Sequence, residues 1–526
     1  MLIARRHVRV PWPLAVPAVA AAVIALIPLV YLVVEAFSRG AANVWDEIFQ
    51  ARTWDLVRNS FLLTAVVTAA SVVLGTGGAW VTTRFALPGK TLILVLLTLP
   101  LAIPSYLSAF AWISWQPQLA GFWGAAIVLT FACFPYVLLP VAAALRGLDP
   151  AQEEVARSLG KTPQQIASEL VLRQVRPSIT AGALLVALYV LSDFGAVAAM
   201  RYETFTWVIY GAYRAGFNPS RAAILSMVLV SAAAVLVILE SRARGRAGAS
   251  RLGSGVARVD RRTTRVGAKI AALGGVAAVL GVGLGVPVAS VISWMGRDTQ
   301  RDVQWSEVMT AVGDSFIVGL LTAIATVLIA LPVGIAAARY ASRFSSVVER
   351  TTYVSHALPG IVIAISVVFV GIRLLRPWYQ ELPLLVLGQV VIFLPLAVAA
   401  IRNSIEQSSP RMEEVAHSLG AGTMATILRV TIPLALPGIG AAAAMTLLNA
   451  MKELPTTLLL RPTGWETLAT SIWKYSTVSD YAAVGPYALA LMLLAALPTA
   501  VLSGLTLLRS QPRPHHSPVT TEAPLS

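Results

Sequence analysis

The sequence predicts an all-α integral membrane protein with about 12 transmembrane helices, divided between two parallel halves of six helices each. Three observations support this fold class: an apolar composition, a series of long apolar segments, and a motif that occurs twice. Of the 526 residues, 57% are hydrophobic and 12% are charged, and the mean hydropathy is +0.75. Such a chain is too apolar for an ordinary water-soluble domain, so we expect lipid to surround it.

The apolar segments, bounded by charges or by proline and glycine turns, give the positions of the helices. A helix needs roughly 20 residues at about 1.5 Å each to cross the hydrocarbon core of a bilayer. In the first half we expect helices at residues 13–35, 60–83, 91–115, 122–145, 178–200 and 221–240. In the second half we expect them at residues 269–294, 315–338, 353–372, 382–401, 438–460 and 484–508. The first segment is longer than the apolar region of a signal peptide and lacks a clear cleavage site, so it predicts an uncleaved helix.

The two halves are residues 1–240 and 269–510, and the segments outside them are polar. Residues 241–268 contain eight arginines among glycine, alanine and serine, which predicts a flexible basic linker. Residues 511–526 are rich in proline and predict a disordered tail. The net charge of +15 would suggest nucleic acid as the partner of a soluble protein, but the sequence contains no nucleic-acid-binding module. We therefore expect membrane lipid, and no nucleic acid, to be a partner.

The distribution of positive charge predicts the orientation in the membrane. When the N-terminus is placed in the cytoplasm, the cytoplasmic segments hold about 27 lysines and arginines against about 11 acidic residues. The outer segments hold about 13 basic residues against about 14 acidic residues. Because lysine and arginine are retained on the cytoplasmic side, we expect a multi-pass protein with both its N- and C-termini in the cytoplasm.

A repeated motif relates the two halves. Residues 150–160 read PAQEEVARSLG, and residues 410–420 read PRMEEVAHSLG. Further matching pairs are Pro177 and Pro437, Asp193 and Glu453, Arg201 and Arg461, Ser60 and Ser315, Arg84 and Arg339, and Pro104 and Pro359. Because each half has an even number of helices, both halves enter the membrane in the same sense and form parallel repeats about an axis along the membrane normal.

Both copies of the motif lie in loops, at residues 150–177 and 410–437, between the fourth and fifth helices of their half. A proline at the start, acidic residues in the first turn and a glycine at the end predict a short surface helix in each loop. The candidate docking residues are Glu153, Glu154, Ala156, Leu159, Gly160, Glu413, Glu414, Ala416, Leu419 and Gly420. Small and apolar side chains on one face suit insertion into a groove of another protein. The alternative is an amphipathic helix that lies on lipid.

The heptapeptides EVARSLG at residues 154–160 and EVAHSLG at residues 414–420 resemble the EAA loop of ABC importer permeases. The resemblance implies the architecture of a type I ABC importer permease in a bacterial inner membrane. It implies as partners two copies of a cytoplasmic ABC ATPase subunit, whose clefts receive the loop helices, and an extracytoplasmic substrate-binding protein. The first half departs from the pattern, because Arg173 stands where the second half has Pro433.

The chain itself does not read as an ATPase or another enzyme. Residues 160–162 and 89–91 both read Gly-Lys-Thr, like the end of a phosphate-binding loop. The glycine that such a loop needs five residues earlier is replaced by Val155 and Arg84. We therefore expect no catalytic residue and no cofactor in this chain, with ATP and Mg²⁺ bound by the partner subunits. The single cysteine, Cys133, excludes an intrachain disulfide, and we expect no metal site.

Charged residues inside the apolar segments mark a candidate translocation path or gate. They are Asp193, Lys452 and Glu453, about 15 residues into the fifth and eleventh helices, together with Arg461. An ionisable group at mid-bilayer costs about 2.5–3.5 kcal/mol, so such residues are functional candidates. Two interpretations stay open, namely a salt bridge that stabilises the gate and direct contact with a cation.

The segments around these charges are similar to those of ferric-iron importer permeases. The similarity lies in SDFG at residues 192–195 and in MKELPTTLLLRP at residues 451–462. It implies import of ferric iron by alternating access. Related permeases handle thiamine, polyamines, phosphonates or sulfate, so these remain alternative substrates. A secondary active transporter with two six-helix repeats is the alternative class, but it would lack the duplicated loop.

Overall fold

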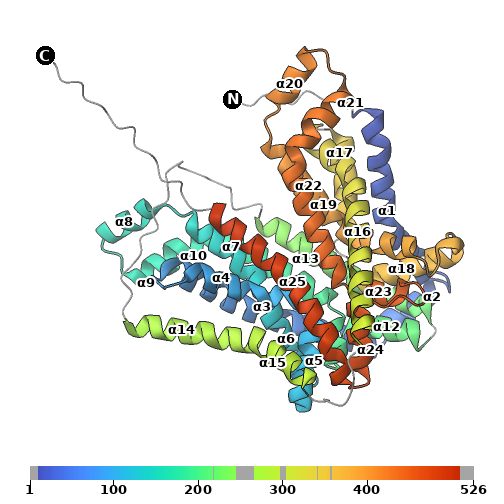
Figure 1. Ribbon diagram of the computed structural model, residues 1–526, viewed down its shortest axis with the longest axis horizontal. Helices are drawn as coiled ribbons and strands as arrows, with labels where there is room; N and C mark the ends of the chain where they lie inside the picture. Colours follow the sequence, from blue (N-terminus) through green and yellow to red (C-terminus); the bar gives the residue numbers. More distant parts are fainter. Residues whose placement is uncertain are drawn as a thin grey trace.

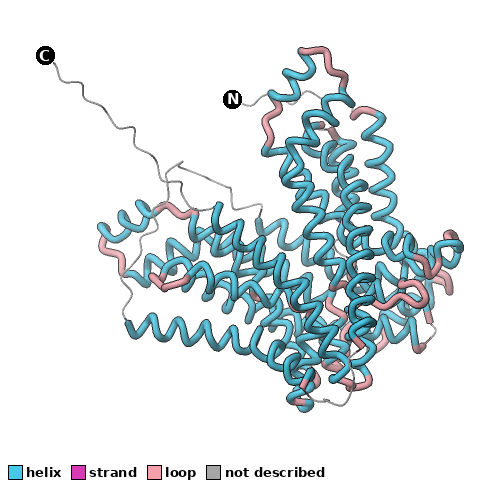
Figure 2. Tube along the Cα trace, viewed as in Figure 1, coloured by secondary structure: helices cyan, strands magenta, loops and turns pink. Residues whose placement is uncertain are grey.

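The computed structural model describes residues 10–216, 218–244, 266–296, 304–340, 342–355 and 358–509. Helices form nearly all of the ordered secondary structure in these residues, and Figure 2 draws no strand in this part of the chain. Most of the predicted linker, residues 245–265, and all of the predicted tail lie outside the described residues.

The first half begins with a long apolar helix and ends with another. Its helices are α1 (Trp12–Ala36), α2 (Ala41–Ile48), α3 (Ala51–Arg84), α4 (Lys90–Thr98), η1 (Leu99–Ala102), α5 (Ser105–Trp115), η2 (Pro117–Leu119), α6 (Phe122–Cys133), α7 (Pro135–Arg146), α8 (Pro150–Ser158), α9 (Pro163–Gln165), η3 (Ile166–Val171), α10 (Leu172–Ser192), α11 (Gly195–Ala199), α12 (Phe205–Arg214) and α13 (Pro219–Arg244).

The second half repeats this order. Its helices are α14 (Val266–Leu280), η4 (Gly281–Gly285), α15 (Val286–Met295), α16 (Trp305–Arg339), α17 (Arg343–Val354), α18 (Gly360–Arg373), η6 (Arg376–Trp378), α19 (Leu382–Gln407), α20 (Arg411–Ser418), α21 (Thr423–Thr426), η7 (Ile427–Thr431), α22 (Ile432–Met451), α23 (Pro455–Leu460), α24 (Leu468–Thr477) and α25 (Tyr481–Arg509).

Among the described residues, nine helices are long and apolar enough to cross a membrane, and a bent pair makes up to ten. The bent pair consists of residues 90–102 and α5, which meet at 89°. The other predicted spans correspond to α18 and α25, whose described apolar parts are shorter, at Gly360–Arg373 and Tyr481–Ala496. The all-α membrane fold class is thus confirmed, although several spans are less regular than the hydropathy predicts.

Repeated prolines explain one pair of breaks. Pro104 precedes α5 and Pro359 precedes α18, and both have extended backbone angles, with ψ of 142° and 144°. A proline lacks the N–H of a helical hydrogen bond and disfavours helical geometry in the residue before it. The predicted helices at residues 91–115 and 353–372 are therefore each divided in two. A second pair of breaks follows α10 and α22, where the predicted spans 178–200 and 438–460 are interrupted.

Each half is built on the same three-helix core, and the first helix of each half packs on the other half. Helix α3 packs against α7 and α10, as α16 packs against α19 and α22. Helix α1 contacts α16, α17 and α18 of the second half, whereas α14 contacts α4 and α15 contacts α5 of the first half. One buried cluster joins Ala18 and Ala21 of α1 to Val333 of α16 and Ile401 of α19. This exchange of first helices ties the halves together.

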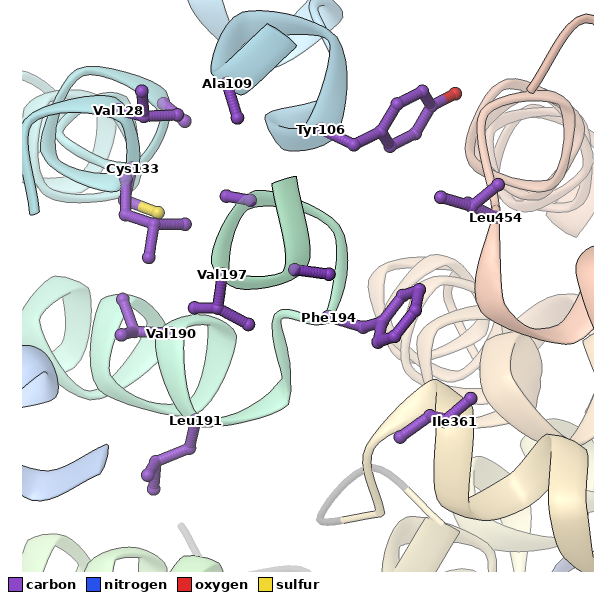
Figure 3. Packing of buried hydrophobic residues seen from close by; sticks show 14 of the residues in the cluster. Tyr106, Ala109, Val128, Cys133, Val190, Leu191, Phe194, Val197, Ile361 and Leu454 are labelled. Atoms are coloured by element: carbon purple, nitrogen blue, oxygen red, sulfur yellow. The ribbon is translucent and has the colours of Figure 1, made fainter. Parts of the chain in front are cut away.

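The two halves form arms that meet at one end and diverge toward the other. In Figure 1, α8 lies at the far end of the arm that contains α3, α7 and α10, and α20 lies at the far end of the arm that contains α16, α19 and α22. The arms meet near α12, α23 and α24. A large buried cluster contains residues of both halves at this junction, among them Phe194, Ile361 and Leu454 (Figure 3).

Candidate coupling helices and gate

Helices α8 and α20, which we call the coupling helices, form at the two predicted loop motifs. The Asp149 side chain caps α8 by accepting a hydrogen bond from the Ala151 N–H at 3.0 Å. Both helices end in a glycine with left-handed geometry, Gly160 at φ +80° and Gly420 at φ +85°. No atom lies within 4 Å of a Cβ built on either glycine. These positions therefore require glycine for its backbone freedom, which sets the exit of the chain from the helix.

One face of each coupling helix exposes apolar side chains. The exposed fractions are 58% for Val155, 75% for Leu159, 55% for Val415 and 82% for Leu419. Glu154 and Glu414 are also exposed, and Ala156 and Ala416 are half-buried. Exposed apolar side chains that are flanked by acidic groups suit a protein partner.

The first acidic residue of each motif points in the opposite direction, toward the membrane helices. Arg84 Nη1 at the end of α3 lies 2.6 Å from Glu153 Oε1, and Arg339 Nε at the end of α16 lies 2.8 Å from Glu413 Oε1. All four side chains are at most 16% exposed. Glu153 and Glu413 thus anchor the coupling helices to the long central helices. The repeat in the sequence carried this signal, because Arg84 matches Arg339 and Glu153 matches Glu413.

The anchors of the two halves have different additional partners: Arg157 Nη2 lies 3.7 Å from Glu153 Oε2 in the first half, and two hydroxyl groups join the anchor of the second half. Arg339 Nη2 also donates to the Ser408 hydroxyl at 2.7 Å, and the Thr431 hydroxyl donates to Glu413 at 2.9 Å. The repeat places Leu148 and Val171 at the corresponding positions of the first half, and neither has a hydroxyl group. In the described part of the chain, Nε and Nη2 of Arg84 have no hydrogen-bond partner. The two loops therefore differ in the hydrogen bonds of their anchors as well as at Arg173 and Pro433.

Asp193 and Glu453 occupy equivalent breaks and cap the short helices that follow. Asp193 Oδ1 accepts the Ala196 N–H at 2.8 Å, and the Ser105 hydroxyl donates to Asp193 Oδ2. Glu453 Oε1 accepts the Thr456 N–H at 2.8 Å, and Oε2 accepts the Thr457 N–H at 3.0 Å. Both acids therefore hold an interrupted helix in place, as capping carboxylates do.

The basic residues of the candidate gate have separate partners. Lys452 Nζ donates to the Leu101 carbonyl at 3.0 Å, a contact between the two halves. Arg461 Nη1 lies 2.7 Å from Glu466 and donates to the Trp465 carbonyl at 2.6 Å. The structure therefore brings Asp193, Lys452 and Glu453 to one region, whereas Arg461 pairs with the neighbouring loop.

A cavity of about 230 Å³ lies between the halves at this region. Its walls include Asp193, Lys452 and Glu453 and three tyrosines that the sequence did not single out, Tyr106, Tyr136 and Tyr189. The tyrosines lie on α5, α7 and α10, so no spacing along the chain relates them. Within the described residues, no group of three or more histidine, cysteine, aspartate or glutamate side chains is placed to hold a metal ion.

Aromatic side chains from both halves close the junction beside this cavity. The Trp473 ring of the second half lies 5.4 Å from the Phe194 ring and 5.7 Å from the Phe110 ring. Tyr210 lies 4.9 Å from Phe194. Tyr213 of the first half also lies 5.8 Å from Phe369 of the second half, so two aromatic-rich segments, residues 202–213 and 465–481, supply part of the contact between the halves. Such ring pairs add about 0.5–1.5 kcal/mol each beyond their buried area.

Comparison with known proteins assigns the chain to a family. A family described as "binding-protein-dependent transport system inner membrane component" matches residues 71–242 and, a second time, residues 330–509. The chain belongs to this family. Both matches contain a coupling helix and a gate acid, and both begin after the helix that is exchanged between the halves. The predicted resemblance to importer permeases is therefore confirmed, and membership favours this class over a secondary active transporter.

Individual relatives extend the comparison. The chain is 36% identical over 479 residues to the Fe(3+)-transport system permease protein FbpB 2 of Haemophilus influenzae, which covers 90% of this chain and 95% of that protein. It is 29% identical over 234 residues to the sulfate transport system permease protein CysT of Salmonella typhimurium, covering 40% and 84%. It is 31% identical over 194 residues to the sulfate permease CysW of a Synechocystis species, covering 33% and 69%.

Proposed function

We propose that this protein is the membrane permease of an ATP-driven importer of ferric iron. The observation that carries the proposal is the similarity to a ferric-iron permease over nearly the whole of both chains. The matches to sulfate permeases cover at most about 40% of this chain, and so give sulfate less support. Thiamine, polyamines and phosphonates remain alternatives of the same importer class.

The coupling helices are the proposed docking sites for two copies of a cytoplasmic ATPase subunit. Leu159 and Leu419 would enter the ATPase clefts, with Glu154 and Glu414 beside them. The ATPase subunits would bind ATP and Mg²⁺, while this chain would bind neither and would catalyse no reaction. Two equivalent helices at the ends of two arms suit a pair of identical subunits, which supports this stoichiometry (Figure 1).

Transport follows from movement of the two arms. In the described conformation the arms are joined at the aromatic junction and apart at the coupling helices (Figure 1). When the ATPase subunits close on ATP, they would draw α8 and α20 together, and the anchors at Arg84 and Arg339 would pass this movement to α3 and α16. The junction would then open toward the loaded binding protein. We further propose that the coupling helices and both chain termini face the cytoplasm, as the charge distribution predicts.

Uptake by the reconstituted complex tests the proposal. The permease is incorporated into proteoliposomes with its cognate ATPase, the binding protein is added outside, and accumulation of radioactive iron is measured with ATP inside. We expect uptake that stops when ATP is replaced by a non-hydrolysable analogue. Accumulation of sulfate, thiamine or a polyamine in place of iron would contradict the substrate assignment.

A further inference from the structure

The cavity between the halves has the size of an ion site and is small for an organic ligand. Its volume is about 230 Å³, whereas pockets for small organic molecules measure about 300–1,000 Å³. At about 30 Å³ for each water molecule, it holds about seven waters. A metal ion with most of its hydration shell therefore fits.

The charges of the wall favour a cation. Asp193 and Glu453 carry two negative charges, and Lys452 carries the single positive charge of the wall, which leaves a formal charge of −1. Lys452 is also held against the wall by its hydrogen bond to the Leu101 carbonyl. An anion such as sulfate would meet two carboxylates and one engaged ammonium group, which is an unfavourable arrangement in a region of low dielectric constant.

Tyr106 supplies a ligand atom that the protein itself does not use. The residue is 3% exposed, and its hydroxyl oxygen has no hydrogen-bond partner in the described residues. Figure 3 shows the ring leaving α5 toward the segment of the opposite half that carries Leu454. Glu453, the residue before Leu454 in the chain, also lines the cavity. A buried phenol without a partner is destabilising by about 1–3 kcal/mol, so an occupant that satisfies it is expected.

We propose that this cavity is a transient binding site for the transported ion, a hard trivalent cation that Tyr106 ligates while Asp193 and Glu453 offset part of its charge. The inference rests on the proposed function and specifies where the ion pauses. Oxygen ligands suit hard cations. On binding, the Tyr106 oxygen replaces one water of the ion, and the phenol proton passes to a water in the cavity; the iron remains ferric throughout.

The same geometry keeps the site weak, as release requires. The gate carboxylates already accept hydrogen bonds from Ser105, from the N–H groups of Ala196, Thr456 and Thr457, and from the Thr457 hydroxyl. These donors withdraw part of the negative charge that the carboxylates offer to a cation. The protein therefore attracts the ion without supplying a full set of free ligands.

The test compares Tyr106→Phe with the wild type in the complete reconstituted importer. Tyr31→Phe is the matched control, because Tyr31 is another buried tyrosine, at 8% exposed, and lies outside the cavity. Ferric citrate is the probe. The readouts are ATP-dependent iron uptake, ATP hydrolysis stimulated by the loaded binding protein, and the visible charge-transfer absorption of a ferric phenolate in the permease.

In Tyr106→Phe we expect iron uptake to fall about fivefold to tenfold and the ferric-phenolate absorption to disappear, with stimulated ATP hydrolysis retained. The wild type and Tyr31→Phe keep all three signals. If wild type imports iron but Tyr106→Phe matches it in uptake and absorption, the site is wrong and the proposed function stands. If wild type imports no iron, the proposed function fails, and absence of the absorption then overturns the site as well.

Discussion

Glu153 and Glu413 lie on surface helices, yet their carboxylates turn toward the membrane bundle and pair with Arg84 and Arg339. From the sequence, these acids were grouped with Glu154 and Glu414 as docking residues, because each motif contains two adjacent glutamates and nothing in the motif distinguishes them. The partner arginine lies about 70 residues earlier in each half. Only folding brings the pair together, and so the division between anchoring and exposed acids could not be predicted from the motif itself.

The unequal anchors predict unequal effects of equivalent substitutions. Glu153→Ala removes the only ion-pair partner of Arg84 within the described residues, whereas in Glu413→Ala the Arg339 side chain keeps Ser408. We expect Glu153→Ala to destabilise the permease by about 1–3 kcal/mol and Glu413→Ala by about half as much. Thermal denaturation in detergent, with exposed Glu154→Ala as the control, measures both. Equal losses in the two halves would contradict the asymmetry.

The capping role of Asp193 predicts that substitution by asparagine and by alanine will affect the stability of the permease differently. Asparagine is as good a helix cap as aspartate, whereas alanine accepts no hydrogen bond from Ala196. Asp193→Asn should therefore keep the stability of the permease, while Asp193→Ala should lower it by about 0.5–2 kcal/mol. The melting temperatures of the two variants give the answer. A loss of stability in Asp193→Asn as large as that in Asp193→Ala would refute the capping role.

At the scale of helices, hydropathy located the membrane segments but missed their breaks. The breaks before α5 and α18 occur at Pro104 and Pro359, and the breaks after α10 and α22 occur at Asp193 and at Lys452 and Glu453. An apolar window has the same mean hydropathy whether its helix is continuous or divided. The cavity lies at these breaks. Its three tyrosines come from three different helices, so the sequence alone could not show that they line one cavity.

The left-handed glycines at the ends of the coupling helices predict a specific defect. Alanine at Gly160 or Gly420 is strained by about 1–2 kcal/mol, although the space around each position is open. We expect Gly160→Ala and Gly420→Ala together to reduce co-purification of the ATPase. Gly147→Ala is the control, because Gly147 has an ordinary φ of −86°. Full retention of the ATPase in the double variant would argue against a role for the helix exits.

The exposed leucines of the coupling helices predict the strength of docking. Burying one leucine contributes about 1.5–3 kcal/mol, so each of Leu159→Ser and Leu419→Ser should weaken ATPase binding about tenfold to a hundredfold. Titration of the purified ATPase against permease in nanodiscs measures the affinity. The melting temperature of the permease alone should not change, since both side chains are exposed. Unaltered affinity in the double variant would exclude these faces as the docking surface.

The whole molecule combines three features: two arms anchored to coupling helices, a junction of aromatic side chains, and first helices exchanged between halves. The repeat in the sequence predicted two halves of the same sense, and the equivalent three-helix cores agree with it. The packing of α1 on the second half, and of α14 and α15 on the first half, was not predicted. The sequence of an apolar helix does not indicate which neighbouring helix it packs against. This exchange makes each arm a mixture of both halves.

The distance between the coupling helices shows directly whether the ATPase moves the two arms. Spin labels on Ala151→Cys and Arg411→Cys, in a background where the buried Cys133 is replaced by alanine, report the separation of α8 and α20. Arg411→Cys paired with Val347→Cys of α17 lies within one arm and is the control. We expect ATP binding by the docked ATPase to shorten the first distance and to leave the second unchanged. A first distance that stays the same with and without ATP would contradict this expectation.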